Sequence, residues 1–203
     1  MNIRVYPAQL SGTFSPPSSK SASHRAVIAA ALARGESQIE ALADNNDITA
    51  TANAMCALGA QIARQGRTAM ISGITRACTQ AQLRCGESGS TLRFLLPVAA
   101  ALGVTATFHG EGRLPGRPID MLLKELRKNG VSDDYEGSMP FTVRGRLRGG
   151  RYEIDGSVSS QFVTGLLFAL PLCEDDSQIV LRGRLESRPY VDMTVSVLSR
   201  FGV

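Results

Sequence analysis

Three segments of this chain combine hydroxyl groups with a cation or an amide, just before an apolar run of helical character. They are residues 23–25 (Ser-His-Arg), 91–93 (Thr-Leu-Arg) and 159–161 (Ser-Ser-Gln), and they are equally spaced along the chain. The start of a helix leaves backbone N–H groups unpaired and carries the positive end of the helix dipole. Three such starts, brought together, would form a strong binding site for an anion.

A second series of residues has nearly the same period. Gly59, Gly130 and Gly202 each close a helical pattern, and the two steps between them are almost equal. Glycine commonly ends a helix because it adopts the left-handed conformation without a steric cost. Two series with almost one period indicate a single folding unit used three times. The chain is therefore predicted to have an α/β (α+β) fold built from βαβαββ units.

Alternating patterns, apolar runs and turn residues predict the elements of each unit. Unit one has a strand at 3–8, a helix at 23–33, a strand at 37–42, a helix from 45 or 46 to 58, and a hairpin at 60–73. Unit two has a strand at 81–86, a helix from 91 that Pro97 interrupts, a strand at 104–110, a helix at 118–129, and a hairpin from 135 to 147. Unit three has a strand at 151–156, a helix after 161, a strand at 177–183, and a helix at 189–201.

Unit three lacks the hairpin that closes the other two. We therefore expect the natural chain to continue for roughly twenty residues or more beyond Val203, by analogy with the other repeats.

Composition limits the possible classes of protein. Apolar residues make up 43% of the 203 residues, enough for a sizeable core. The longest apolar run, at 94–104, is too short to cross a bilayer as a helix. The N-terminus has no cationic-then-apolar signal pattern. We expect a protein of the cytoplasm that does not enter a membrane.

Neither metal binding nor nucleic-acid binding is favoured. The four cysteines form no C-x-x-C pair, and the two histidines form no ligand cluster with them, so reduced thiols are expected. The net charge is +4, but the basic residues lie in turns without interleaved aromatic residues.

Several loops carry groups that could hold a phosphorylated ligand. Residues 18–25 place small residues and hydroxyls between Lys20 and Arg25, and residues 85–93 place two glycines and three hydroxyls before a helix. Residues 113–119 form a turn with two arginines, and residues 155–162 offer hydroxyls and an amide. Each could be an ordinary helix cap with solvated charges. Their alignment at the repeat interval favours a shared site.

Together these segments resemble the 5-enolpyruvylshikimate-3-phosphate (EPSP) synthase family over essentially the whole chain. The family's signatures are similar to residues 17–25, 86–93, 113–119, 155–161 (Asp-Gly-Ser-x-Ser-Ser-Gln) and 187–190 (Ser-x-Pro-Tyr), in the same order. The resemblance implies a transferase of the shikimate pathway, which serves aromatic amino-acid biosynthesis and is the target of glyphosate. It would transfer the enolpyruvyl group of phosphoenolpyruvate to the 5-hydroxyl of shikimate 3-phosphate and release phosphate.

The resemblance also implies a role for individual residues. Phosphoenolpyruvate would contact Lys20, Gly89, Arg117 and Gln161. Shikimate 3-phosphate would contact Lys20, Ser21, Arg25, Ser159, Ser160, Gln161, Ser187 and Tyr190. No metal or organic cofactor is implied, and the acid/base groups would come from the C-terminal half of the enzyme, which as a full-length protein is expected to be a monomer.

The resemblance implies a division into domains as well. Residues 1–14 would belong to the other domain. Residues 15–203 would form the first domain, with three repeats around a pseudo-threefold axis, the third of them truncated, and with the helices of the repeated segments buried side by side. This half is expected to be inactive alone.

One departure from the family pattern affects the predicted phosphoenolpyruvate contacts and glyphosate sensitivity. Glu87 stands where relatives often have Asn, and a carboxylate beside an anionic substrate is unfavourable unless it points away or pairs with a cation. A UDP-N-acetylglucosamine enolpyruvyl transferase shares the fold, but Lys20, Ser21 and Arg25 do not fit its first motif. A phospho-sugar-binding module without catalysis is the alternative from another class.

Overall fold

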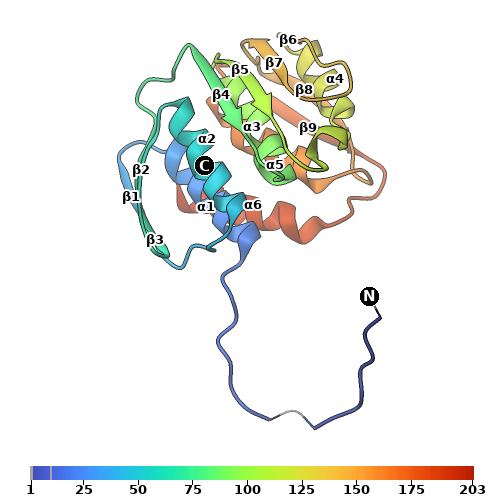
Figure 1. Ribbon diagram of the computed structural model, residues 1–203. Coiled ribbons are helices and arrows are strands. Elements are labelled where there is room, and N and C mark those ends of the chain that lie inside the picture. The colour runs from blue at the N-terminus through green and yellow to red at the C-terminus, as the bar shows by residue number, and fades with distance from the viewer. Residues whose placement is uncertain (1, 10) are drawn as a thin grey trace.

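The computed structural model describes residues 2–9 and 11–203, which form three successive units of one pattern (Figure 1). Unit one contains α1 (Lys20–Leu32), β1 (Glu36–Ile39), α2 (Asn46–Leu58), β2 (Gln61–Gln65) and β3 (Thr68–Ser72). Unit two contains β4 (Gln80–Arg84), α3 (Gly89–Ala101), β5 (Thr105–His109), the short helix η1 (Leu114–Gly116), α4 (Asp120–Lys128), β6 (Val131–Asp133) and β7 (Phe141–Gly145). Unit three contains β8 (Gly150–Asp155), α5 (Ser160–Ala169), the short helix η2 (Leu170–Leu172), β9 (Ser177–Arg182) and α6 (Arg188–Arg200).

The sheets repeat with the units. β4 pairs in parallel with β5, and β8 pairs in parallel with β9. The hairpin of unit one lays β3 antiparallel on β1, and the hairpin of unit two lays β7 antiparallel on β5. Unit two thus shows the complete βαβαββ order, and the predicted repeat is confirmed. The matching edge of β9 carries no further strand among the described residues.

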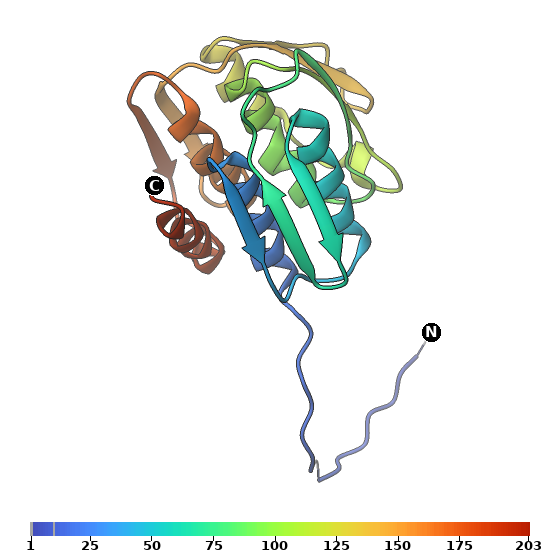
Figure 2. The same ribbon diagram turned by 90° about the vertical axis from the view of Figure 1, so that its left-hand side faces the viewer.

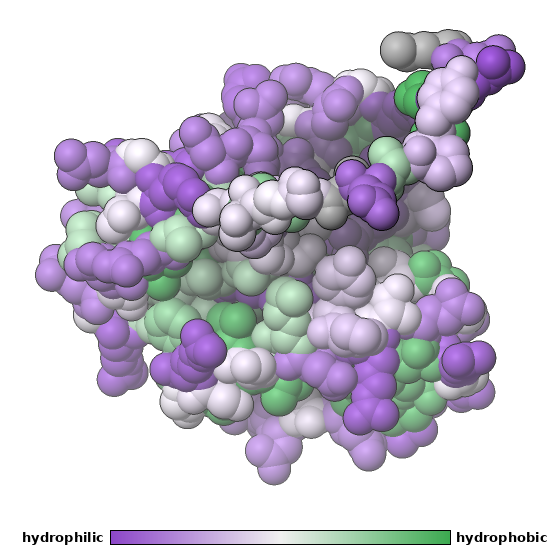
Figure 3. Space-filling view, turned by 90° about the horizontal axis from the view of Figure 1, so that it is seen from below, coloured by the Kyte–Doolittle hydropathy of each residue, from purple (hydrophilic) through white to green (hydrophobic). Residues whose placement is uncertain are grey.

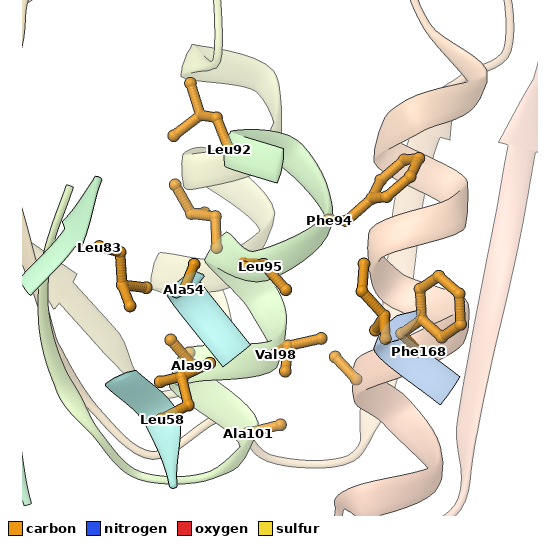
Figure 4. Packing of buried hydrophobic residues seen from close by; sticks show 14 of the residues in the cluster. Ala54, Leu58, Leu83, Leu92, Phe94, Leu95, Val98, Ala99, Ala101 and Phe168 are labelled. Carbon is orange, nitrogen blue, oxygen red and sulfur yellow. The ribbon is translucent and has the colours of Figure 1, made fainter. Parts of the chain in front are cut away.

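Three inner helices form the centre of the core. α1, α3 and α5 are apolar nearly all round, as expected of helices buried on every side. α3 and α5 pack directly on each other, and the rings of Phe94 of α3 and Phe168 of α5, both labelled in Figure 4, lie 6.2 Å apart between centroids. α1 reaches α3 through the ring of His24, which meets Phe94 edge-on at 6.2 Å between centroids. The predicted burial of the three helices is confirmed, but of the three only α3 and α5 lie directly side by side, because α1 packs mainly on α2 and α6.

Small residues allow the close approach of α3 and α5. A Cβ atom on Gly165 would lie 2.4 Å from the backbone oxygen of Arg93 and 3.0 Å from Cγ of Pro97. Pro97 was predicted to interrupt the helix, and this is wrong, because α3 continues through it to Ala101. Proline removes one backbone hydrogen bond from a helix, and here its ring is packed tightly against the neighbouring helix. Packing on all sides holds the helix together at this point.

Helix ends follow the sequence closely, except that α4 begins at Asp120 and not at 118, and that two other helices begin earlier than predicted. α2 is capped by Asn45 and closed by Gly59 in the left-handed conformation, as predicted. α1 begins at Lys20 and not at residue 23, because the hydroxyl of Ser19 caps the backbone N–H of Ala22. α3 likewise begins at Gly89, where Ser88 is the cap. Each added turn brings polar residues of the preceding loop onto the helix.

The N-terminal segment forms no regular structure. Residues 2–9 and 11–16 extend away from the domain, as Figures 1 and 2 show, and they project beyond its body in the space-filling view of Figure 3. Ser18 and Ser19 already belong to the domain, since Ser18 contacts Arg67 and Ser19 caps α1. The strand predicted at 3–8 is therefore absent, because no described strand lies beside it to supply hydrogen bonds. Ile3, Val5 and Tyr6 are exposed. That residues 1–14 belong to another domain stays a prediction; Met1 and Leu10 lie outside the described residues.

Two other kinds of feature are absent from the described residues. Among the described residues, no helix has the length and apolarity needed to span a bilayer. In the same part of the chain, no three His, Cys, Asp or Glu side chains come together as metal ligands.

Candidate functional site

The starts of four helices surround one polar cavity. α1, α3, α5 and α6 direct their first turns toward a space of about 360 Å³. All eight residues predicted for shikimate 3-phosphate line it, and Ser90, Phe94 and Val158, which were not predicted, line it too. The full lining is Lys20, Ser21, Arg25, Ser90, Phe94, Val158, Ser159, Ser160, Gln161, Ser187 and Tyr190.

The loops before α5 and α6 fix the serines of the cavity. Ser159 caps α5, and its hydroxyl accepts a hydrogen bond from the backbone N–H of Gln161 at 3.2 Å. The carboxylate of Asp155 accepts bonds from the backbone N–H and the hydroxyl of Ser157, at 2.9 and 2.6 Å, and these bonds lower the pKa of that carboxyl. Ser187 has a φ of 59°, a left-handed conformation unusual for a residue other than Gly. Such strain is often found where a side chain must be presented to a ligand.

Arg25 is the central cation of the site. Its side chain is 2% exposed and donates from Nε to the hydroxyl of Thr194 at 2.8 Å. Its Nη atoms donate to the hydroxyl of Thr164 at 3.1 Å and to the backbone oxygens of Ser21 and Tyr190 at 2.9 and 3.0 Å. All four partners are neutral, and no described carboxylate forms an ion pair with the guanidinium group.

Burial without a counter-charge changes the acid–base properties of Arg25. Desolvation lowers the pKa of the guanidinium from 12.5 to about 10, with Tyr190 acting in the opposite direction. The ring of Phe94, at 5.1 Å from the guanidinium carbon, gives partial compensation through a cation–π contact. At neutral pH the group remains charged, and one cavity wall therefore carries an uncompensated positive charge.

Lys20 is the second cation of the cavity, and it differs from Arg25 in its surroundings. Its Nζ is 2.7 Å from a carboxylate oxygen of Asp47, in the first turn of α2. The lysine side chain is half exposed, so the pair is accessible to solvent. An exposed pair of this kind is weak. An anionic ligand could therefore displace Asp47 at small cost.

Two residues predicted for phosphoenolpyruvate, Gly89 and Arg117, do not line the cavity. They lie together beside it, since a Cβ on Gly89 would be 2.8 Å from Nη1 of Arg117 and 3.6 Å from Nη1 of Arg93. Arg93 in turn donates to Oε1 of Gln161 at 2.7 Å. Gln161 therefore connects this second group of cations with the cavity that it lines. No described carboxylate forms an ion pair with Arg93 or Arg117.

Glu87 does not bring its carboxylate against Gly89. Its side chain is exposed and fills the space beside Gly112, where a Cβ would be 1.6 Å from Oε1 of Glu87. Gly112 has a φ of 55°, so this position favours Gly on two grounds. The carboxylate is directed at the loop around Gly112.

A buried polar network supports the cavity from behind. Nδ1 of His24 is 2.7 Å from the hydroxyl of Thr51, which is 2.7 Å from that of Thr91, and Thr91 donates to the hydroxyl of Ser88 at 2.8 Å. Burial lowers the pKa of His24 from 6.5 to about 4, although Asp47 raises it. His24 is therefore neutral at physiological pH, and its network joins α1, α2 and α3 without adding charge.

Sequence reasoning missed the threonines that hold Arg25. Thr164 and Thr194 are both fully buried, and their hydroxyls lie 3.0 Å apart. In the sequence, each of these threonines places a hydroxyl group at an otherwise apolar position of a helical pattern, which indicates a buried hydrogen bond. That signal does not reveal which distant side chain the hydroxyl meets.

A larger cavity elsewhere lacks comparable chemistry. It measures about 580 Å³ and lies between the end of α5, β9 and α6. Its walls are mainly apolar, with three acidic residues at 174–176, and none of the predicted residues line it. A site for an anion belongs to the smaller, cationic cavity.

Comparison with known proteins agrees with this geometry. The family model described as EPSP synthase (3-phosphoshikimate 1-carboxyvinyltransferase) matches residues 5–203. Curated proteins named 3-phosphoshikimate 1-carboxyvinyltransferase are similar to the chain, with 40% identity for the Clostridium beijerinckii protein and 42% for that of Clostridium kluyveri. These alignments cover 100% and 99% of this chain but 48% of each relative, so the chain spans about half the length of the curated relatives it matches.

A solved structure shares the fold. The structure of EPSP synthase from Acinetobacter baumannii superposes with a TM-score of 0.79 at 25% identity, covering 94% of this chain and 44% of that one. The α/β repeat architecture is therefore that of a known enzyme class. Because the family model covers nearly all of the sequence, the chain belongs to the EPSP synthase family.

Proposed function

We propose that this chain is the substrate-binding half of a cytoplasmic 3-phosphoshikimate 1-carboxyvinyltransferase. In that reaction the 5-hydroxyl oxygen of shikimate 3-phosphate adds to C2 of phosphoenolpyruvate while a proton adds to the methylene carbon. The tetrahedral adduct then loses a proton from the methyl group and breaks its C–O bond to phosphate. The double bond is restored, and inorganic phosphate leaves.

The observation that carries the proposal is the buried, uncompensated charge of Arg25. A buried cation without a carboxylate partner is costly, and here it lies in the wall of an open cavity. The remaining lining offers hydroxyl donors and acceptors, which suit a phosphorylated ring with free hydroxyl groups. An anionic ligand would supply the missing counter-charge. Shikimate 3-phosphate fits both requirements.

A second anion would bind beside the first. Arg93 and Arg117 both approach Gly89, and Arg93 donates a hydrogen bond to Gln161, outside the shikimate cavity. A phosphate or carboxylate favours paired guanidinium groups. We assign this position to phosphoenolpyruvate, with Lys20 and Gln161 between the two ligands.

The proton transfers require groups that this cavity does not contain. No Asp, Glu or His lines it, and His24, which lies behind it, is neutral and buried. Proton transfer by a positioned side chain contributes about 10²–10⁴-fold to a rate. We therefore propose that the acid and base belong to a second half, of the kind that accounts for the rest of the Clostridium relatives' length.

Two measurements test the proposal. Calorimetry of the chain with shikimate 3-phosphate should show binding, whereas RNA of matched charge should not bind at physiological salt. Phosphate release from both substrates should be undetectable with the chain alone. It should appear when the remaining half of the Clostridium beijerinckii protein is added.

Each negative result has its own meaning. No binding of shikimate 3-phosphate would contradict the proposed site. Binding without turnover in the mixture, under conditions where both halves are folded, would favour the alternative of a phospho-sugar-binding module. Turnover by the chain alone would show that the acid and base lie within it.

A further inference from the structure

Arg93 stands at the same place in unit two as Arg25 does in unit one. The repeat interval places Arg25, Arg93 and Gln161 at equivalent positions, each in the first turns of an inner helix. Arg25 and Gln161 both line the cavity, but Arg93 does not. The family resemblance includes Arg93 in a signature segment but assigns it no substrate contact. Its place between two predicted substrate positions therefore needs an explanation.

The contacts of Arg93 are directed at the start of α5. Nη1 donates to Oε1 of Gln161 at 2.7 Å, and Nη2 donates to the backbone oxygen of Pro118 at 3.2 Å. The guanidinium carbon lies 5.5 Å from the ring centre of Phe162, the next residue after Gln161. Two neighbouring residues of α5 are thus held by one side chain from α3.

This arrangement fixes which end of the Gln161 amide faces the cavity. A guanidinium group carries only donors, so the atom that meets Nη1 must be the amide oxygen. The amide nitrogen then points the other way and donates one bond to the hydroxyl of Ser90 at 2.9 Å. Its second N–H remains for a ligand. If the amide were reversed, its oxygen would face an anionic substrate and repel it.

Fold stability alone does not account for Arg93. Its Nε is buried without a hydrogen-bond partner among the described residues, which is rare in folded proteins. Burial and the neighbouring charge of Arg117 both lower the pKa of the guanidinium. No described carboxylate compensates this charge. A neutral side chain would fill the same space without these costs.

We propose that Arg93 is a positioning residue that holds Oε1 of Gln161 and so presents the Gln161 N–H to a phosphate or carboxylate oxygen of the bound substrate. The orientation of Gln161 follows from contacts within the chain. The identity of the ligand rests on the proposed function. The two parts can be tested separately.

The first test needs no ligand. The side-chain amide of Gln161 is observed by NMR in ¹⁵N-labelled chain and assigned by its loss in Gln161→Leu. We expect two separate proton signals with slow solvent exchange. In Arg93→Met the exchange should become at least about tenfold faster, as for an opened hydrogen-bonded site. Arg117→Met removes the same charge but no bond to Gln161, and it should leave these signals in place.

A second variant, which keeps the positive charge, controls for the possibility that Arg93→Met does not fold. Arg93→Lys retains the cation, but an ammonium group lacks the planar fork that holds Gln161 and Pro118 at once. In Arg93→Lys the exchange rate of the Gln161 side-chain amide should lie between the rates in the wild type and in Arg93→Met. An unchanged Gln161 amide in both Arg93 variants would overturn the proposal.

The second test measures binding of shikimate 3-phosphate by calorimetry in a double-mutant cycle. Arg93→Met should weaken binding about tenfold, the loss typical of one hydrogen bond involving a charged partner. In the Gln161→Leu background the same change should cost less than about twofold. An equal loss in both backgrounds would show that Arg93 acts by its charge alone. If the wild-type chain does not bind this ligand, the proposed function fails and the amide experiment alone decides the role of Arg93.

Discussion

Replacing Arg25 with Met separates its contribution to folding from its contribution to binding. The lowering of its pKa from 12.5 to about 10 corresponds to a penalty of about 3 kcal/mol for keeping the charged group in the folded protein at neutral pH. Its four hydrogen bonds each contribute about 1 kcal/mol. The two effects nearly cancel.

The partners of Arg25 would not be left without bonds. Thr164 and Thr194 lie within hydrogen-bond distance of each other, and Thr194 also donates to the backbone oxygen of Tyr190 at 2.9 Å. We therefore expect Arg25→Met to change the free energy of unfolding by less than about 2 kcal/mol. Because the pKa stays far above neutrality, this change should not depend on pH between 6 and 8.

Ligand binding should respond much more strongly. Loss of a charge-assisted hydrogen bond costs about 1.5–3 kcal/mol, so the Kd for shikimate 3-phosphate should rise about tenfold to a hundredfold. Urea unfolding measures the free energy of unfolding, and titration calorimetry measures the Kd. Arg146→Met removes the same charge from an exposed residue that does not line the cavity, and it should leave both nearly unchanged.

Two results would refute this reasoning. A stable Arg25→Met variant that binds shikimate 3-phosphate as tightly as the wild type would remove Arg25 from the site. A loss of more than about 4 kcal/mol of stability would show that the guanidinium is retained mainly for folding, contrary to the cancellation of its burial cost by its hydrogen bonds.

Other features allow further tests. Burial lowers the pKa of His24 from 6.5 to about 4, so its contribution to stability is present above pH 6.5 and is lost as the pH falls toward 4. Between pH 7 and pH 5, the free energy of unfolding measured in urea should therefore fall by about 2 kcal/mol more in the wild type than in His24→Asn. Gly165→Ala should destabilise the chain by about 1–3 kcal/mol, since its Cβ would meet a backbone oxygen of α3, whereas Gly116→Ala has open space and should change stability by less than about 0.5 kcal/mol in the same unfolding assay. Burial raises the pKa of Cys85 to about 12, so it should resist a thiol reagent in the folded chain and react only in urea, while the exposed Cys56 should react at once.

Much of the site could be predicted because its residues lie at helix starts that recur along the chain. The eight residues assigned to shikimate 3-phosphate come from three loops, and all of them line one cavity. Periodicity placed the loops of the first and third repeats before the inner helices α1 and α5, and the third loop precedes α6. The resemblance to a family then supplied the role of each residue, which periodicity alone could not do.

What could not be predicted depends on which helices become neighbours. The contact of Arg25 with Thr194 spans 169 residues, and the contact of Arg93 with Gln161 joins two units. Nothing in the local sequence specifies such pairs. The prediction of a strand at 3–8 was wrong for a related reason. The local pattern suits a strand, but no partner strand lies beside it among the described residues.

The repeat also explains how a nearly symmetric scaffold produces an asymmetric site. Three equivalent positions near the starts of the inner helices are occupied by Arg25, Arg93 and Gln161. A third arginine would add another buried guanidinium next to two that already lack carboxylate partners, and burial of each such charge is costly. An amide at the third position avoids this cost and can accept a bond from one arginine while it offers an N–H to a ligand. The divergence of one repeat from the other two thus gives an asymmetric set of side chains, two arginines and one amide, at three equivalent positions.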